Sequence, residues 1–309
     1  KVILSGWVET LRVQGKVSYL ILRDREGITQ CFINNDLTKE LSGLLIESVV
    51  SVEGKVKARP ANQVRKEIKT GEIEIEATKV KVVSRAETPL PIDIFEESTT
   101  NMDKRLDYRF LDLRRKKINA VFKVRSKIFQ HTVEFFSKEG FVNIQTPKLT
   151  EAGVESGAQE FKIPYFKKTA SLAQSPQVYK QMFVISGLER VYEIAPVFRA
   201  EKSHTTRHLT EFTGIDIEMG FIKDENDVMD ILDELMKFIL IQVKEKCKEE
   251  LELLNVKIEV PKQIPRLTLE EVRKLLEKKG KKLKEDEDLD SEGEKIIGEI
   301  IKEKYNSDL

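Results

Sequence analysis

The sequence predicts an α+β protein, in which an all-β segment precedes a larger region of helices packed on an antiparallel sheet. Residues 1–85 contain five stretches where apolar and polar residues alternate, as in strands with one buried face. Residues 118–139 and 224–250 carry apolar residues at helical spacing, which predicts two long amphipathic helices. Between these helices, residues 191–221 show the pattern of two strands joined by a polar loop, which predicts a hairpin.

The composition is that of a globular chain long enough for about two domains. Its 309 residues are 40% hydrophobic and 34% charged, which allows a buried core under a charged surface. Apolar runs stay well short of the ~20 residues that a membrane-spanning helix needs, so we expect no membrane partner. Cys31 and Cys247 are the only cysteines and form no Cys-x-x-Cys pair. They indicate neither a disulfide framework nor a zinc site, and they fit a cytoplasmic location.

Residues 1–85 predict a small barrel. A short helix at Leu37–Leu45 falls between the third and fourth strands, which is the order of an OB-fold, a barrel that often binds oligonucleotides. The segment holds 15 Lys and Arg against 11 Asp and Glu. This modest basic excess favours nucleic acid, although a generic barrel without such a role has the same pattern. The five predicted strands are residues 2–12, 17–24, 28–34, 49–59 and 72–83.

Residues 86–113 have the composition of a linker, with Pro89, Pro91 and polar clusters. The helix at residues 118–139 has a stop signal at Gly140 and is followed by a strand that ends at Pro147. The apolar positions of this helix are Ile118, Val121, Phe122, Ile128, Phe129, Thr132, Val133 and Phe136.

A shorter helix is predicted after a Gly-containing loop and a strand at residues 161–166. Ser175 is a suitable N-cap and Pro176 a suitable first helical residue. The helix then places Gln177 and Lys180, three residues apart, on one face. Such a pair is usually solvated and indicates no function by itself.

The hairpin at residues 191–221 brings unlike polar groups to one surface. Strand alternation places Arg199, Glu201 and Asp216 on one face, with Phe212 near its edge. Charges on the solvent face of a sheet are ordinary. Here, however, each group suits a different part of a nucleotide ester, because arginine binds phosphate oxygens, an aromatic ring stacks on a base, and a carboxylate holds an ammonium group.

Further helices follow the hairpin. Thr268 and Glu271 form a capping box for a helix that runs to Gly280. Residues 278–290 predict a charged turn, and residues 291–305 a last amphipathic helix. The apolar stripe of the helix at 224–250 is typical of a core and comprises Val228, Ile231, Leu232, Leu235, Met236, Ile239 and Val243.

Three strings of the hairpin, FRAE, TTRHLTEF and GIDIEM, resemble motif 2 of the class II aminoacyl-tRNA synthetases, and most closely the aspartyl-tRNA synthetases of the archaeal and eukaryotic type. The helix and strand that end at Pro147 resemble motif 1, which in the family builds a homodimer interface. The resemblance implies an OB-fold anticodon-binding domain at residues 1–85, a hinge at 86–113, and a class II catalytic domain at 114–309 with motifs 1 and 2 and a middle insertion.

The function that this resemblance implies is ATP-dependent activation of aspartate to aspartyl-adenylate and transfer to the 3′ end of tRNA(Asp). Whether tRNA(Asn) is also charged stays open. Expected partners are tRNA, aspartate, ATP with Mg²⁺, and a second copy of the chain. Asparaginyl-tRNA synthetase has the same architecture, but Lys180 favours a charged substrate. An aspartate-amidating relative would normally lack the barrel, and a non-catalytic tRNA-binding protein is a further alternative.

The resemblance assigns ATP to the hairpin. Arg199 would bind the α-phosphate and neutralise the charge that develops during transfer, which makes it the expected catalytic residue. Glu201 would contact the adenine edge, Phe212 would stack on the ring, and His208 would approach the outer phosphates. His204 and His208 lie four residues apart, but the Thr-Thr-Arg between them lacks the glutamate of zinc-protease helices, so we expect no metal there.

Aspartate is assigned to residues around the string QSPQVYKQ. Lys180 would pair with the side-chain carboxylate of aspartate, and Gln177 would hydrogen-bond the substrate. Glu155 and Asp216 would hold its ammonium group. The family usually has glycine where this chain has Ser156, which restricts the backbone next to Glu155.

Contacts with tRNA are assigned to two places. In the barrel, Arg12, Tyr19 and Gln30 match a cation, a stacking aromatic and an amide that read anticodon bases. Glu9 replaces a residue that is often aromatic in archaeal members, so reading of the third anticodon base stays open. The loop expected to meet the acceptor end contains Ser203, His204 and Thr205.

Motif 3 has no counterpart in these 309 residues. That motif would supply a Gly-rich strand and helix with an arginine for the γ-phosphate, and the acidic ligands of Mg²⁺ are expected with it. We therefore expect a chain that is C-terminally incomplete and unable to complete catalysis as it stands.

Overall fold

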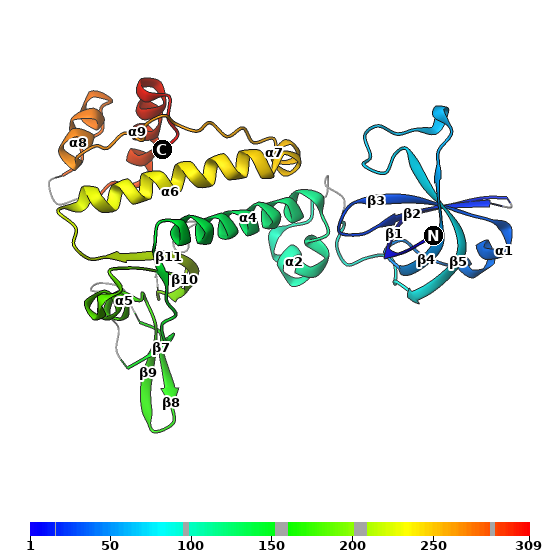
Figure 1. Ribbon diagram of the computed structural model, residues 1–309, viewed down its shortest axis with the longest axis horizontal. Helices are drawn as coiled ribbons and strands as arrows, with labels where there is room; N and C mark the ends of the chain where they lie inside the picture. Colours follow the sequence, from blue (N-terminus) through cyan, green and yellow to red (C-terminus); the bar gives the residue numbers. More distant parts are fainter. Residues whose placement is uncertain (16, 95–98, 152–159, 201–208, 285–287) are drawn as a thin grey trace. The chain divides into compact units, whose positions relative to one another are not determined.

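The computed structural model of the chain (Figure 1) describes residues 1–15, 17–94, 99–151, 160–200, 209–284 and 288–309. The chain divides into two compact units. One holds Lys1–Asp93 and Ser98–Tyr108, and the other holds Ile94–Glu97 and Arg109–Leu309. Within the described ranges, no helix is long and apolar enough to cross a membrane.

The first unit is built on a closed five-stranded barrel with the strand order β1-β2-β3-β5-β4, which confirms the predicted OB-fold. Between β3 and β4 lie α1 (Asn35–Thr38) and a 3₁₀ turn at Lys39–Leu41. This helical segment begins before the predicted Leu37, because the side chain of Asn34 caps it by accepting the N–H of Leu37. The strands are β1 (Val2–Gln14), β2 (Val17–Arg23), β3 (Ile28–Ile33), β4 (Val49–Ala58) and β5 (Ile73–Ser84).

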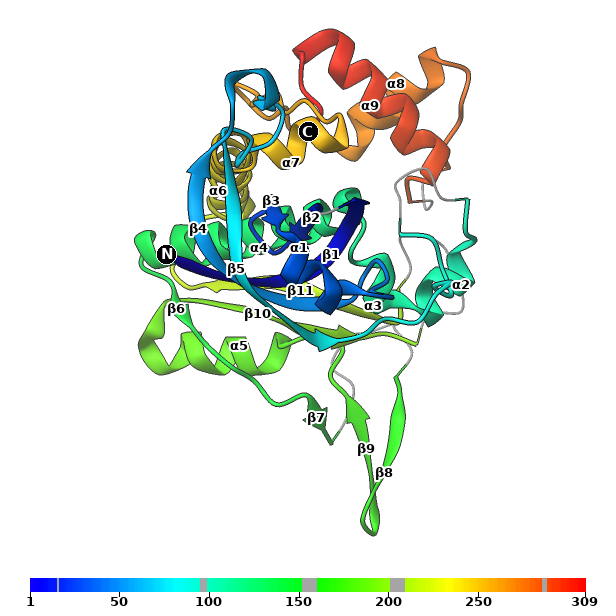
Figure 2. The same cartoon turned by 90° about the vertical axis from the view of Figure 1, so that its right-hand side faces the viewer.

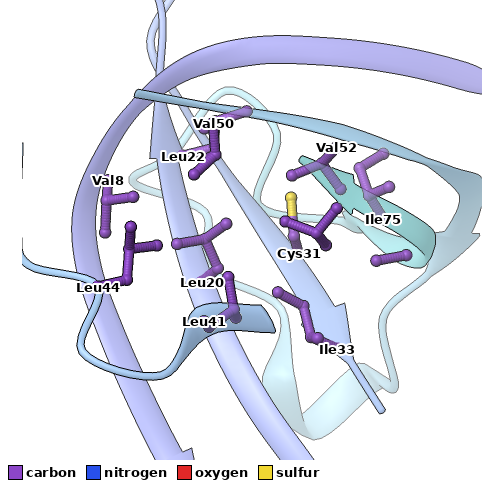
Figure 3. Packing of buried hydrophobic residues seen from close by; sticks show 12 residues of the cluster. Val8, Leu20, Leu22, Cys31, Ile33, Leu41, Leu44, Val50, Val52 and Ile75 are labelled. Carbon is purple, nitrogen blue, oxygen red and sulfur yellow. The ribbon is translucent and has the colours of Figure 1, made fainter. Parts of the chain in front are cut away.

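Alternate residues of these strands fill the barrel. Figure 3 shows Val8, Leu20, Leu22, Cys31 and Val52 pointing into one cluster, and each is at most 2% exposed. Burial of this apolar surface is the main force that closes the barrel. Burial, and to a lesser extent the charge of Glu74, raises the pKa of the Cys31 thiol to about 12. The thiol is therefore protonated and part of the core.

The segment expected as a linker contains two short helices, α2 (Met102–Asp107) and α3 (Arg109–Asp112). Asn101 caps α2, since its side-chain oxygen accepts the N–H of Lys104 at 3.0 Å. The buried carboxylate of Asp112 pairs with the guanidinium of Arg109. Pro89 and Pro91 precede both helices and do not interrupt them. The prediction of a linker over all of residues 86–113 therefore missed the two helices in its second half.

The second unit carries a three-stranded sheet with the order β11-β10-β6. The predicted hairpin is confirmed as β10 (Arg190–Phe198) and β11 (Glu211–Met219), which pair antiparallel. β6 (Val142–Asn143) adds a parallel pair with β10, so the sheet is not wholly antiparallel. Figures 1 and 2 show α4 (Lys116–Lys138) and α6 (Glu225–Lys246) on one side of this sheet and α5 (Gln177–Phe183) on the other.

The helix-facing side of the sheet holds the core of this unit. Phe136 of α4 stacks on Tyr192 of β10, with ring centroids 4.7 Å apart. Ile217 of β11 packs against the same cluster. The buried residues that α6 adds to the core are Ile231, Leu235, Ile239 and Val243.

Part of the predicted apolar stripes is nevertheless exposed. Val121, Phe122 and Phe129 of α4 and Leu232 of α6 are between 40% and 53% exposed. Each apolar stripe covers more of its helix than the part that packs on the other helix and on the sheet. The apolar residues at the edge of each stripe are therefore left uncovered by the described residues. The predicted helix to residue 250 is also broken, because α6 ends at Lys246 and α7 (Lys248–Leu254) follows.

Smaller elements complete the unit. β7 (Leu149–Thr150), β9 (Lys168–Leu172) and β8 (Lys162–Tyr165) form a second sheet in that order. Pro176 is the N-cap of α5 rather than its first residue, and the hydroxyl of Ser175 accepts the N–H of Gln177 at 3.0 Å. The two C-terminal helices are confirmed as α8 (Leu269–Lys278), with its capping box, and α9 (Ser291–Tyr305).

Candidate active site

One face of the β10–β11 hairpin carries Arg199 and Asp216, two of the three polar residues that the sequence predicts together; the third, Glu201, lies outside the described residues. The register places Val197 opposite Phe212 and Glu193 opposite Asp216. The backbone N–H of Arg199 donates to the carbonyl of Thr210 at 3.0 Å, which continues the ladder beyond β10. Arg199, Phe212 and Asp216 therefore point to the same side and line one pocket, which the segment Gln174–Pro176 closes. This part of the prediction is confirmed, whereas the strand ends at Met219 and not at Phe221.

Arg199 and Phe212 lie against each other in this pocket. The guanidinium carbon is 5.6 Å from the centroid of the Phe212 ring, a cation–π distance. The Nε atom of Arg199 is buried and has no hydrogen-bond partner among the described residues. A buried donor without an acceptor costs free energy, so this guanidinium is placed to bind an anionic group that enters the pocket.

Lys180 lies at one end of the same face and is 9% exposed. Its ammonium group pairs with Asp216, donates to the carbonyl of Ile217 at 3.0 Å, and lies 3.2 Å from Glu218. The side-chain amide of Gln177 donates to the same Glu218 carboxylate at 3.3 Å. Gln177 and Lys180 thus share one face of α5, as predicted, and that face meets a pair of carboxylates on β11.

Comparison with protein-family models gives a match to the tRNA synthetases class II (D, K and N) over residues 101–309. A second model, the OB-fold nucleic acid binding domain, matches residues 2–83. The chain belongs to the class II tRNA synthetases. The predicted family is confirmed, and the synthetase is accordingly an enzyme of the ligase class.

Similarity to known synthetases extends over nearly the whole chain. Aspartate–tRNA(Asp) ligase of Pyrococcus horikoshii is 41% identical over 315 residues, which include all of this chain and 70% of the relative. Aspartate–tRNA(Asp/Asn) ligase of Archaeoglobus fulgidus is 41% identical over 305 residues, or 97% of this chain and 69% of the relative.

Solved structures agree with the fold. The asparaginyl-tRNA synthetase of Pyrococcus horikoshii, complexed with asparaginyl-adenylate, superimposes with a TM-score of 0.86 at 32% identity, over 97% of this chain and 68% of that one. The aspartyl-tRNA synthetase of Entamoeba histolytica gives 0.83 at 30% identity, over 99% of this chain and 66% of that one.

The synthetase holds the segment after β6 through a buried carboxylate. Glu193, which is 4% exposed, accepts the backbone N–H of Thr146 at 2.7 Å and its hydroxyl at 2.8 Å. The ammonium group of Lys148 lies 2.9 Å from the same carboxylate. Pro147, the residue expected at a dimer interface, follows Thr146 directly, so the chain just before it is held by Glu193, which lines the pocket.

On the barrel, the predicted anticodon residues lie on neighbouring strands. Arg12 of β1 is paired with Tyr19 of β2, and Tyr19 is paired with Phe32 of β3. The rings of Tyr19 and Phe32 meet edge to face at 5.7 Å. Gln30, two residues before Phe32 and on the same face, donates to Glu74 at 2.9 Å. Arg12, Tyr19 and Gln30 are thus brought to one outer surface of the barrel.

Six predicted site residues lie outside the described residues, namely Glu155, Glu201, Ser203, His204, Thr205 and His208. Sequence reasoning missed three residues that the structure adds, Glu193, Glu218 and Phe32. Glu218 shares the strand parity of Asp216, and Phe32 that of Gln30, so alternation could have found both. Nothing local distinguishes Glu193 from any other strand glutamate.

Among the described residues, no group of three His, Cys, Asp or Glu side chains lies close enough together to hold a metal ion.

Proposed function

We propose that the synthetase is an aspartate–tRNA ligase, which activates aspartate with ATP and transfers the aspartyl group to the 3′ end of tRNA(Asp), in the cytoplasm and as a homodimer. The observation that carries this proposal is the buried ammonium group of Lys180 between Asp216 and Glu218. The proposal is supported by the 41% identity to aspartate–tRNA ligases.

The charges of this cluster are complementary to those of aspartate. Among the described residues, Lys180 is the cation that pairs with Asp216 and Glu218. An incoming side-chain carboxylate can take the place of Asp216 on Lys180, and Asp216 is then free to bind the incoming ammonium group. The exchange gives Lys180 a carboxylate partner from the substrate and gives Asp216 an ammonium partner, while Glu218 stays 3.2 Å from Lys180. Asparagine brings a neutral amide and cannot make this exchange, which favours the aspartyl over the asparaginyl alternative.

Arg199 and Phe212 supply the nucleotide half of the pocket. The ring of Phe212 offers a face for adenine, and the Arg199 guanidinium can bind the α-phosphate through two N–H groups. The reaction joins the aspartate carboxylate to that phosphorus with loss of pyrophosphate, and no side chain need act as a nucleophile. Arg199 holds the two reactants together and stabilises the negative charge that grows on the phosphate oxygens.

The barrel surface would bind the anticodon. Tyr19 and Phe32 offer two ring faces for unstacked bases, and Arg12 and Gln30 flank them with a cation and an amide. Glu9 is engaged by Arg23 at 3.0 Å, so a role for Glu9 in reading a base would require that ion pair to open.

The test is aspartate-dependent ATP–pyrophosphate exchange by the complete protein. We expect Lys180→Gln to lower kcat/KM for aspartate by about 100-fold or more, since it leaves Asp216 and Glu218 without their counter-charge. Arg199→Ala should abolish exchange. Lys223→Gln, at an exposed position outside the pocket, is the matched control. Unchanged aspartate kinetics in Lys180→Gln would refute the assignment of Lys180 to the aspartate side chain. A separate charging assay with tRNA(Asp) and tRNA(Asn) decides whether the protein charges one of these tRNAs or both.

A further inference from the structure

The β8–β9 hairpin ends in a pair of exposed aromatic rings for which the active site has no use. Figures 1 and 2 show this hairpin extending away from the rest of its unit. At its tip Tyr165 is 48% exposed and Phe166 is 93% exposed. Their ring centroids lie 4.9 Å apart, edge to face. Two large apolar side chains are thus held in water at the end of a narrow hairpin.

The backbone at the tip adds a second cost. Tyr165 pairs with Lys168 across the hairpin, so Phe166 and Lys167 form a two-residue loop. Phe166 has a φ of 52°, the left-handed region in which glycine is favoured at the first position of such loops. A phenylalanine there is strained and exposed, and nothing within the described fold offsets either cost. This combination indicates a ring kept for a contact outside the chain.

The charge around the rings identifies the kind of partner. Lys162, Lys167 and Lys168 are all exposed at this hairpin, and the sequence has no acidic residue between Glu160 and Glu189. Lysines beside exposed rings are the combination that binds RNA, because cations pair with phosphates and rings stack on bases. A protein partner of matching charge would have to be acidic and would gain less from open ring faces.

We propose that the tip of the β8–β9 hairpin binds the acceptor arm of the tRNA that the synthetase charges. The inference rests on the proposed function, because the pocket fixes where the 3′ end of that tRNA must lie. β9 leads from Lys168 directly to Gln174, which lines the pocket. Six residues of extended chain span about 20 Å at most. The tip is therefore within reach of an acceptor arm whose end is in the pocket, and Phe166 takes an unstacked base or a terminal base pair.

The main test uses the complete protein and an RNA minihelix that contains only the acceptor arm of tRNA(Asp). Phe166→Gly removes the ring and the backbone strain together, so the thermal midpoint should stay equal or rise. Affinity for the minihelix should fall by about 5- to 100-fold, the usual effect of losing one stacked base. A hairpin RNA with only the anticodon arm should bind as before.

The chain offers a matched control in Phe221, which is also 93% exposed and has a φ of 56°. The residues that follow it hold a single lysine, Lys223, against Asp224 and Glu225, and this local charge disfavours phosphate. Phe221→Gly should therefore relieve the same kind of strain without changing minihelix affinity. An equal loss of affinity in both variants would overturn the proposal.

Salt dependence tests the lysines separately. Replacing Lys167 and Lys168 by alanine should lower the slope of log K against log salt concentration by about 0.7–0.9 for each phosphate that the protein no longer neutralises. The proposal is overturned if Phe166→Gly binds the minihelix as strongly as the wild type does. It is also overturned if Phe166→Gly sediments differently from the wild type, because the tip would then contact a second copy of the chain. Pyrophosphate exchange by the unchanged protein needs no RNA, so its absence refutes the proposed function independently of the hairpin.

Discussion

Glu193 gives the sharpest prediction about stability. Glu193→Ala removes the acceptor of two Thr146 donors, the backbone N–H at 2.7 Å and the hydroxyl at 2.8 Å. Thr146 is 8% exposed, so water cannot readily replace the missing acceptor, and each unsatisfied donor costs about 1–3 kcal/mol. The side chain of Lys148 is 25% exposed and can turn to solvent, so its ion pair adds little. We expect a loss of about 3–5 kcal/mol in the free energy of unfolding.

The assay is urea unfolding followed by far-UV circular dichroism and by tryptophan fluorescence. Trp7 is the only tryptophan and lies in β1 of the barrel, so fluorescence reports on the first unit alone. With a slope of about 2–3 kcal/mol per molar urea, Glu193→Ala should lower the dichroism midpoint of the second unit by about 1–2 M. The fluorescence midpoint should not move. Glu193→Gln keeps one acceptor and should cost roughly half as much.

Glu211→Ala is the control, because this β11 glutamate is exposed and its removal should change stability by no more than about 0.5 kcal/mol. A loss below about 1 kcal/mol in Glu193→Ala would show that Thr146 finds other partners. A matching shift of the Trp7 curve would show that the two units unfold together. The first result would refute the anchoring role of Glu193, and the second would refute the independent unfolding of the two units.

Three further outcomes are expected. Cys31 should resist a thiol reagent at pH 8 until the barrel unfolds, as mass spectrometry of labelled peptides would show, because burial raises its pKa to about 12; labelling of the folded chain would contradict this. Gly54→Ala should lower the urea midpoint of Trp7 fluorescence, because a Cβ there would collide with the backbone oxygen of Glu76. Gly298→Ala is the opposite case: the added Cβ on α9 meets open space, so this variant should raise the free energy of unfolding by about 0.5–1 kcal/mol. The hydrogen bond from the backbone N–H of Thr268 lowers the pKa of Glu271, so the stabilising effect of Glu271 is present above its unfolded pKa of about 4.3 and is lost as pH falls through the folded value. The difference in thermal midpoint between the wild type and Glu271→Gln should therefore close as the pH falls below about 4.3.

Local patterns in the sequence determined the elements and much of the pocket. Period-2 alternation is enough to place strands and to assign Arg199, Phe212 and Asp216 to one face, because successive side chains of a strand point to opposite sides. Helical spacing and caps likewise located α4, α5, α8 and α9 to within a few residues. The string QSPQVYKQ and the strings of the hairpin identified the family before any contact was known.

Only the tertiary structure decided which groups meet across the fold. Lys180 is 38 residues from Glu218, and Glu193 is 47 from Thr146; no local period links such positions, because their contact depends on how α5 and the segment after β6 dock on the sheet. Exposure is likewise a property of packing, so the uncovered side of α4 and the strained ring of Phe166 could not be seen in the sequence. The strands follow from short-range sterics and hydrophobic pattern, whereas the pairing of buried charges follows from the assembled shape.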